Sequence, residues 1–527
     1  MHSLSAQTVS PWRSLLTKLV LILTNHKNYF AVITFSISLL LLILGYVFYG
    51  RFVERVFGCD ASHPTPVTLK ADGVDYIALP GWKVFMIQFL NIAGTGPIFG
   101  AIMGAKFGAA AYLWIVLGCI FAGAVHDFLS AMLSLRNGGM GLPELIGKYL
   151  GGKTRSLMLV FTVLLLIMVG AVFVYSPALL LEKFGGDVTM WFAIIFAYYI
   201  LATMLPIDKI IGKIYPVFAF SLLFMAVTLM VCLFVKMPAI PEIWDGLSNR
   251  ALTVVPDWKQ DLFPCLFITI ACGAISGFHA TQSPLMARCL KSEGNARRIF
   301  YGAMITEGMV ALVWATIAMY FFYGEPTPGH ESFPGFGNKG FSTAAPTVVS
   351  LVCNHWLGWF GGLLAILGVV AAPITSGDTA LRSARLIIAE AFRVPQQKIR
   401  HRFLISIPIF AATLGLLLWQ VGNPEGFNVI WQYFGWSNQT LSVFTLWMLT
   451  VYLTLKHKPY VITLVPAVFM TSVCATYLIV SPEALNLPAG IGYATAACAA
   501  AVSLLFFFIW KKDVREREAK QNAEKTA

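Results

Sequence analysis

Charged side chains are scarce in this chain of 527 residues, because Asp, Glu, Lys and Arg together make up only 12% of it. A typical soluble domain contains about twice that share. Hydrophobic residues make up 58% of the chain, which is more apolar surface than a soluble fold can cover with so few charges. The composition therefore excludes a cytosolic enzyme, a secreted disulfide scaffold and a disordered protein. It predicts an all-α polytopic membrane protein.

Cysteine patterns that bind metals are also missing. None of the nine cysteines forms a C-x-x-C pair or another metal-ligand spacing, so we expect neither a metal site nor a cofactor. The net charge of +12 does not require nucleic acid as a partner, since cationic loops on one side of a membrane explain it. The lipid bilayer is the surface that this composition fits.

Long apolar stretches are abundant. A membrane-spanning helix needs about 20 mostly apolar residues, and the chain has about thirteen candidates. They lie at 29–49, 84–105, 109–133, 156–181, 190–206, 214–235, 262–282, 299–323, 346–376, 403–420, 436–455, 460–480 and 490–510. A shorter apolar stretch, Leu15–Leu23, contains Lys18 and is expected to form an interfacial helix rather than a span.

The spans suggest five regions. We expect an N-terminal segment 1–83 with one span, two five-helix blocks at 84–235 and 262–455, two further spans in 456–510, and a charged cytoplasmic tail at 511–527 that is solvated or disordered. With thirteen spans, 28 of the 37 Lys and Arg residues fall on one side of the membrane. Because cytoplasmic loops carry excess cations, this asymmetry predicts an outer N-terminus and a cytoplasmic C-terminus.

Two spans carry glycine and small polar residues near their middle. Pro97 lacks an N–H group and disfavours helical geometry at Gly96, so the first of these spans should unwind there. The freed N–H groups suit a substrate carboxylate, and the freed carbonyls suit a cation. The predicted substrate site comprises Asn91, Gly94, Thr95 and Gly96 of the first span, and Gly273, Ser276, Gly277 and His279 of the second. The alternative is that these small residues only allow close helix packing.

The interrupted spans lie five helices apart and enter from opposite sides, so each opens one of the blocks. That arrangement is expected of inverted repeats in transporters. A 5+5 inverted repeat with a broken first helix in each half resembles the amino-acid/polyamine/organocation (LeuT-like) transporter fold.

Carboxylates within the spans are few, and such groups are functional candidates by default. Glu307 lies roughly 12 Å into its span at 1.5 Å per residue and is the preferred proton carrier. Asp127 and Asp378, near the cytoplasmic ends of their spans, are further candidates. The alternative for these two is a structural pairing with Arg136, Arg382 or Arg385. The adjacent amides of Asn438 and Gln439 indicate interhelical hydrogen bonds, a structural role.

Several of these segments are similar to motifs of the carbon starvation protein A (CstA) family. They are Phe263–His279, Ile92–Pro97, Gly123–Phe128, Asp378 and Thr379 with Arg382 and Arg385, and Tyr433–Gly435 followed by Asn438 and Gln439. The chain departs from the family in being shorter, with one fewer N-terminal span. It also has His126 where the family has Gln, and it lacks a small insertion after His279.

The resemblance implies a transporter of the bacterial inner membrane, linked in the family to peptide uptake during carbon starvation. Some relatives take up pyruvate, with protons. We therefore expect a secondary active importer of short peptides, coupled to a proton or to sodium, with pyruvate or a similar small carboxylate as the alternative substrate. An intramembrane hydrolase using Asp127 and Asp378, and a nutrient sensor, are remote alternatives, and no catalytic residue is assigned.

Overall fold

The computed structural model describes residues 32–182, 185–205, 211–324, 338–423 and 426–526. Regular structure within these ranges is entirely helical, without a β-strand. The predicted interfacial segment Leu15–Leu23 lies outside them.

The helices follow one another along the chain. They are α2 (Ile33–Leu44), α3 (Gly50–Phe57), α4 (Pro66–Leu69), α5 (Gly81–Ile92), α6 (Ala101–Gly104), α7 (Ala110–Leu113), α8 (Ala124–Arg136), α9 (Leu142–Leu150), α10 (Gly152–Leu181), α11 (Val188–Met204), α12 (Ile211–Lys236), α13 (Ala251–Val254), α14 (Leu262–Thr269), α15 (His279–Ala287), α16 (Gly302–Tyr323), α17 (Asn338–Phe341), α18 (Ala345–Ala391), α19 (Ile399–Val421), α20 (Gly426–Leu455), α21 (Val461–Val480) and α22 (Ala489–Thr526). Short wider or tighter helical turns occur at η2 (Gly96–Gly100), η3 (Ala105–Phe107) and η4 (Trp114–Gly123).

Eight helices in the described ranges are long and apolar enough to cross a membrane, or nine if one bent pair counts as a single span. Large apolar side chains cover their outer surfaces, as at Phe220, Leu404 and Phe506. Exposed apolar residues on this scale fit a lipid environment and not water. The chain is therefore a multi-pass membrane protein.

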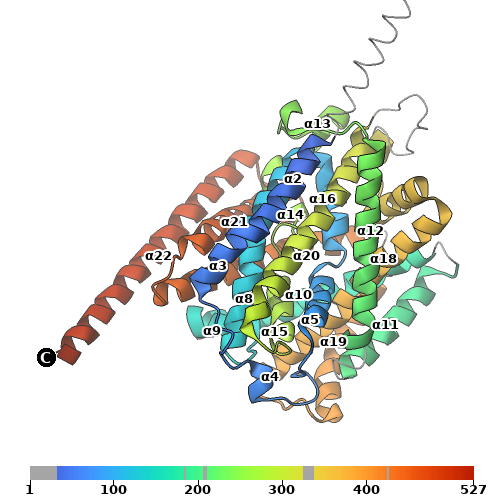
Figure 1. Ribbon diagram of the computed structural model, residues 1–527. Coiled ribbons are helices and arrows are strands. Elements are labelled where there is room, and N and C mark those ends of the chain that lie inside the picture. Colours follow the sequence, from blue (N-terminus) through green and yellow to red (C-terminus); the bar gives the residue numbers. More distant parts are fainter. Residues whose placement is uncertain (1–31, 183–184, 206–210, 325–337, 424–425, 527) are drawn as a thin grey trace, which may run out of the picture.

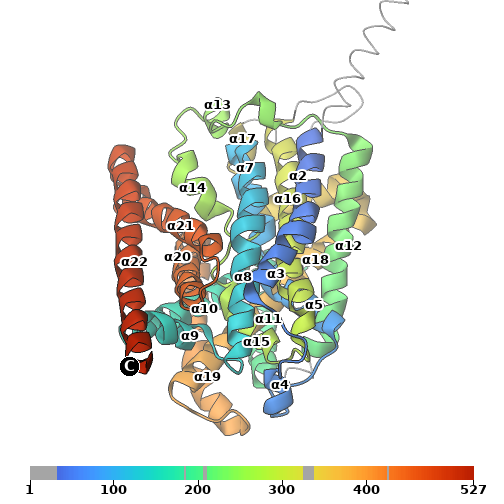
Figure 2. The ribbon, with the colours of Figure 1, turned by 60° about the vertical axis from the view of Figure 1, so that its left-hand side comes forward.

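The helices form one bundle, with α13 at one end and α4 at the other (Figure 1). The helices α10, α18 and α12 pack side by side, and α21 packs on α22. Helix α22 stands along one edge of the bundle and carries the C-terminus (Figure 2).

The charged C-terminal segment is helical. Helix α22 continues from the apolar residues through Thr526, so the disordered form suggested for 511–527 is wrong for the residues described. This segment contains no Gly or Pro and many Lys, Glu, Arg and Ala residues, which favour helix. Lys512 and Glu516 also pair at 3.8 Å, one helical turn apart.

Both spans that the sequence predicts to be interrupted are broken. Helix α5 ends at Ile92, and the helical segment Gly96–Phe107 follows at an angle of 53°. The predicted span 262–282 is two short helices, α14 and α15, separated by the non-helical residues 270–278. Gly273 lies in this break with a φ of +91°, a conformation that glycine adopts readily. The second break is therefore longer than the first.

Candidate substrate and proton site

The two breaks lie against each other. A Cβ atom on Gly96 would overlap the side chain of Cys272, so the backbone of the first break touches the second break at this cysteine. A Cβ atom on Gly100 would lie 2.8 Å from the carbonyl oxygen of Thr269, where α14 ends. The small residues thus provide the close packing that was one alternative, and this packing also brings the two breaks together.

The first break holds buried polar groups without partners. Both side-chain atoms of the Asn91 amide and the hydroxyl of Thr95 lack a hydrogen bond to any described residue, and neither residue is exposed. Leaving such groups unpaired is costly, by about 1–3 kcal/mol each. These groups therefore have unused hydrogen-bonding capacity. Gly94, on the same break, packs on Phe173 and Ser376.

The second break is fastened to α20. The amide nitrogen of Asn438 donates to the hydroxyl of Ser276 at 3.0 Å, and its oxygen accepts the backbone N–H of Phe278 at 2.6 Å. The amide nitrogen of Gln439 donates to the carbonyl of Phe267 at 2.9 Å. Gly277 packs directly on the backbone of Asn438. Both amides thus connect α20 to the second interrupted span, Asn438 at the break itself and Gln439 at α14.

A network of titratable side chains surrounds the second break. Nδ1 of His279 lies 2.8 Å from Oδ2 of Asp127, and Nδ1 of His126 lies 2.8 Å from Oδ1 of the same carboxylate. On its other side, Nε2 of His279 lies 3.5 Å from Oε2 of Glu307. All four side chains are fully buried. Asp127, Glu307 and His279, from three separate helices, therefore form one site.

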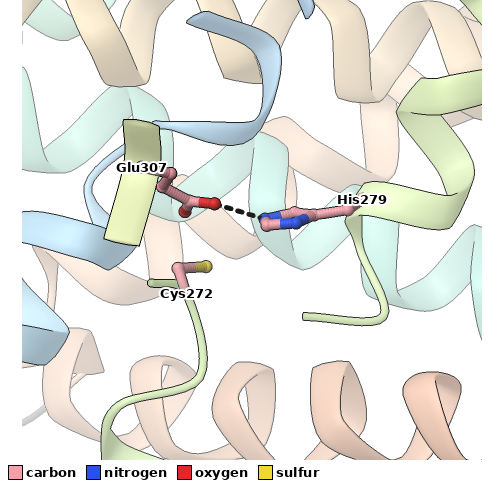
Figure 3. A group of neighbouring side chains, drawn as sticks. All are labelled: Cys272, His279 and Glu307. Atoms are coloured by element: carbon pink, nitrogen blue, oxygen red, sulfur yellow. Dashed lines mark ion pairs between the residues drawn. The ribbon is translucent and has the colours of Figure 1, made fainter. Parts of the chain in front are cut away.

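Cys272, His279 and Glu307 are the described side chains that could hold a metal ion. Figure 3 shows the glutamate facing the imidazole, with the thiol beside the pair. The donor atoms of all three lie within 4.8 Å of one another. Thiolate, imidazole and carboxylate are the ligands that Zn²⁺ prefers. Because the group contains only one cysteine, a C-x-x-C type of spacing does not reveal it in the sequence.

Asp378 and the two nearby arginines have other partners than those suggested from the sequence. The hydroxyl of Tyr215 donates to Asp378. Arg382 and Arg385 instead pair with Asp75, at 3.2 and 3.3 Å. Asp378 thus bonds to α12, whereas the His279 network joins Asp127 and Glu307.

Arg136, the third suggested arginine, pairs with Glu293 at 2.5 Å. The suggested pairing of Asp127 with an arginine is therefore wrong, because histidines occupy both of its oxygens.

A cavity of about 350 Å³ lies beside the breaks. It reaches Thr269, the last residue of α14, and Gly435 of α20. Its lining also includes Phe99, Lys106, Trp258, Trp431 and Gln432.

One sequence pattern suggests a nucleotide site. Residues Gly147–Thr154 fit the phosphate-binding pattern GxxxxGK[ST], which requires a strand before the loop and a helix after it. Here the pattern joins two helices, α9 and α10, and Gly147 packs on Arg155. Arg155 in turn pairs with Glu144. The context that would support nucleotide binding is absent from this described segment.

Comparisons with known proteins identify the family. The model of the carbon starvation protein CstA family matches residues 30–178, 174–325 and 335–477. An uncharacterized membrane protein of Haemophilus influenzae is 45% identical over 336 residues, which are 55% of this chain and 91% of that protein. The pyruvate/proton symporter BtsT of Escherichia coli is 27% identical, over 86% of this chain and 81% of its own length. The peptide transporter CstA of Escherichia coli is 26% identical, over 82% and 78%.

Solved structures share the fold at low sequence identity. A mutant of the Eremococcus coleocola manganese transporter has a TM-score of 0.52 at 13% identity, covering 85% of this chain and 99% of that one. A Na⁺-coupled sialic acid symporter has a TM-score of 0.50 at 15% identity, covering 90% and 96%. The fold is thus one that membrane transporters use, and the chain belongs to the carbon starvation protein CstA family.

Proposed function

We propose that this protein is a secondary active transporter of the bacterial inner membrane that imports short peptides with a coupling proton. The names of its relatives, peptide transporter and pyruvate/proton symporter, support transport of a carboxylate-bearing solute. The observation that carries the proposal is the meeting of the two breaks, where unpaired polar groups lie on one side and the His279–Glu307 pair lies on the other.

The first break supplies groups for the solute. Backbone N–H groups freed at a half-helix N-terminus bind a carboxylate well. Asn91 and Thr95 add a side-chain amide and a hydroxyl that have no partner within the described residues. The backbone of Gly94, Gly96, Gly273 and Gly277, with Ser276 and His279, completes the proposed substrate site.

A peptide is the first candidate and pyruvate the second. Both carry the carboxylate that this site suits, so the break alone does not separate them. The cavity of about 350 Å³ favours the peptide, because sites for ligands larger than pyruvate begin at about 300 Å³.

The His279–Glu307 pair supports coupling to a proton. If the ionised Asp127 accepts a hydrogen bond from Nδ1–H of His279, then Nε2 of the neutral ring is an acceptor. That nitrogen faces a carboxylate oxygen of Glu307 at 3.5 Å, and two lone pairs facing each other in a dry interior repel. One proton on either group turns the repulsion into attraction, so the pair would hold a single exchangeable proton. Sodium is the alternative coupling ion.

We also propose the finer architecture on the same evidence. Residues 84–235 and 262–455 would form two inverted five-helix repeats of a LeuT-like fold within about thirteen spans. The broken helix near the start of each block supports this. The excess of Lys and Arg in alternate loops supports an outer N-terminus and a cytoplasmic C-terminus.

Uptake into proteoliposomes tests the proposal. We expect labelled di- and tripeptides to accumulate when the lumen is alkaline, with pyruvate as the parallel substrate and a sodium gradient as the parallel driving force. Protein-free liposomes are the control. No accumulation of either solute under either gradient would show that the proposal is wrong and would favour a sensor or a hydrolase.

A further inference from the structure

Lys106 is a buried cation at one end of the bundle. It lies in η3, at the end of the helical segment that follows the first break, and is 4% exposed. Phe341 of α17 and Trp258 surround it, and α17 lies with α13 at the same end of the bundle (Figure 2). Lys106 also lines the cavity of about 350 Å³ described above.

The ammonium group has no counter-ion in the part of the chain that the structure describes. Nζ donates to the carbonyl of Phe341 at 2.6 Å, and the rings of Trp258, Phe322 and Phe341 lie 5.4–5.9 Å away. None of the ion pairs among the described residues includes Lys106, and no described charge acts on it. An ammonium has three N–H donors, and only one is used here. A buried charge of this kind normally has a paired anion.

A second buried polar group lines the same cavity without a partner. The side-chain oxygen of Gln432, on α20, accepts no hydrogen bond from the described residues. It could accept an N–H group of a solute. A cavity that combines an unpaired cation with an unpaired amide oxygen is complementary to a carboxylate joined to an N–H group, as in a peptide C-terminus.

We propose that this cavity binds the C-terminal carboxylate of a peptide at Lys106 and a peptide N–H at Gln432, before the solute reaches the breaks. The cavity extends to Thr269, where the second break begins, so a bound peptide would already contact the edge of the substrate site. The identity of the anion rests on the proposed function, whereas the presence of a carboxylate site rests on the unpaired ammonium.

Tryptophan fluorescence of the purified full-length chain in detergent tests the inference, because Trp258 and Trp431 line the cavity. We expect dialanine to change the emission saturably, and dialanine amide to bind about tenfold more weakly or worse, because it lacks the charge that Lys106 would pair. Lys106→Met should weaken dialanine binding by a similar factor, and Lys106→Arg should retain it. Trp258→Phe and Trp431→Phe should reduce the signal if it comes from this cavity.

Lys83→Met is the matched control. Lys83 also lies beside a tryptophan, with Nζ 5.6 Å from the ring of Trp82, but it does not line the cavity. Equal dialanine binding by the wild type and Lys106→Met, with both proteins monodisperse and equally heat-stable, would overturn the inference.

Measurements of uptake distinguish a failure of this inference from a failure of the proposed function. In proteoliposomes, Lys106→Met should raise the KM for dialanine about tenfold and leave the maximal rate largely intact. An unchanged KM overturns the inference even if binding in detergent is too weak to measure. If the wild type neither binds nor accumulates peptide or pyruvate, the proposed function itself fails.

Pyruvate and its methyl ester, titrated in the same way, show whether the site accepts any carboxylate. Selective binding of pyruvate alone would overturn the peptide assignment.

Discussion

Nδ1 of His279 lies 2.8 Å from Oδ2 of Asp127, and this contact joins the second broken helix to α8. Its effect is to fix the ring so that the other nitrogen points at Glu307. A carboxylate that holds one face of an imidazole sets both its tautomer and its orientation. The network is therefore organised around a single ring nitrogen, and the first two predictions concern its two sides.

Glu307→Gln should abolish accumulation of solute driven by a pH gradient while preserving exchange of labelled for unlabelled solute. The amide keeps the shape of the side chain but cannot exchange a proton. Proteoliposome uptake and counterflow measure the two activities separately. Glu516→Gln, on the exposed part of α22, is the control and should behave as the wild type. Persistent accumulation by Glu307→Gln would exclude Glu307 as the coupling group.

Asp127→Asn should reduce uptake by roughly tenfold or more, because a charged acceptor of two buried hydrogen bonds is replaced by a neutral one. The asparagine leaves the ring of His279 free to adopt the other tautomer, so the pH profile of uptake should change as well. A variant with a lower rate but an unchanged pH profile would indicate a purely structural role. Intact uptake would remove Asp127 from the coupling network altogether.

Asn91→Leu and Thr95→Val should lower the affinity for solute without lowering the stability of the fold. The groups that they remove have no hydrogen bond among the described residues, so the free energy of unfolding should stay the same or rise. Solute affinity should fall about tenfold if each group binds the solute. Thermal unfolding in detergent and the KM for uptake give the two values. Ser376→Ala is the matched control, because its hydroxyl donates to Leu90 at 2.9 Å and its loss should lower stability.

Asp75→Asn should destabilise the protein by about 3–5 kcal/mol, since it leaves the buried Arg382 and Arg385 without their carboxylate. Burial raises the pKa of Asp75, but the guanidiniums of Arg385, Arg382 and Arg288 outweigh it, so the pKa lies below its ordinary value. The ionised form therefore stabilises the fold at pH above about 3.9, the pKa in the unfolded chain, and this contribution disappears as the pH falls through the lower folded-state pKa.

Thermal unfolding at pH 7 and at successively lower pH tests the role of Asp75. The difference between wild type and Asp75→Asn should be large at neutral pH and shrink in acid. Asp513→Asn, on the exposed part of α22, should show neither effect. A constant difference across the pH range would mean that the charge of Asp75 does not stabilise the fold.

Chelation should leave transport unchanged if Cys272, His279 and Glu307 hold a proton and not a resident metal ion. Uptake before and after dialysis against EDTA gives the comparison, with metal analysis of the purified protein alongside. A different result would make the group a metal centre: EDTA abolishes uptake, added Zn²⁺ restores it, and the Cys272→Ser variant is not restored by Zn²⁺.

The sequence predicts the polytopic helical character and both breaks better than it predicts the partners of the buried side chains. The described ranges contain eight helices that could span a membrane, or nine with the bent pair, against about thirteen predicted spans. Apolar runs give the spans directly, and Pro97 with its neighbouring glycines marks the first break, since these are local properties. The pairing of Asp75 with Arg385 joins residues 310 positions apart. Which buried charges meet depends on how helices pack, and no local pattern records that.

His126 and Cys272 illustrate the same difference. Both lie inside the motifs that indicate the family, so the sequence placed them near the site without giving them a contact. Cys272 resembles the other buried cysteines until its break folds against Gly96 and α16. No local pattern marks Lys106 as buried, because the aromatic rings that surround it come from segments more than 150 residues away.

The contact between Gly96 and Cys272 bears on slippage, which is the movement of the coupling proton through a carrier without its solute. Only backbone and one small side chain separate the two breaks. If the breaks moved apart, both would therefore lose packing contacts at the same time. A solute that satisfies the exposed groups on each side would offset that loss, whereas an empty or half-filled site would not. The same glycine that lets the chain pack this closely would then also oppose movement of the proton without its cargo.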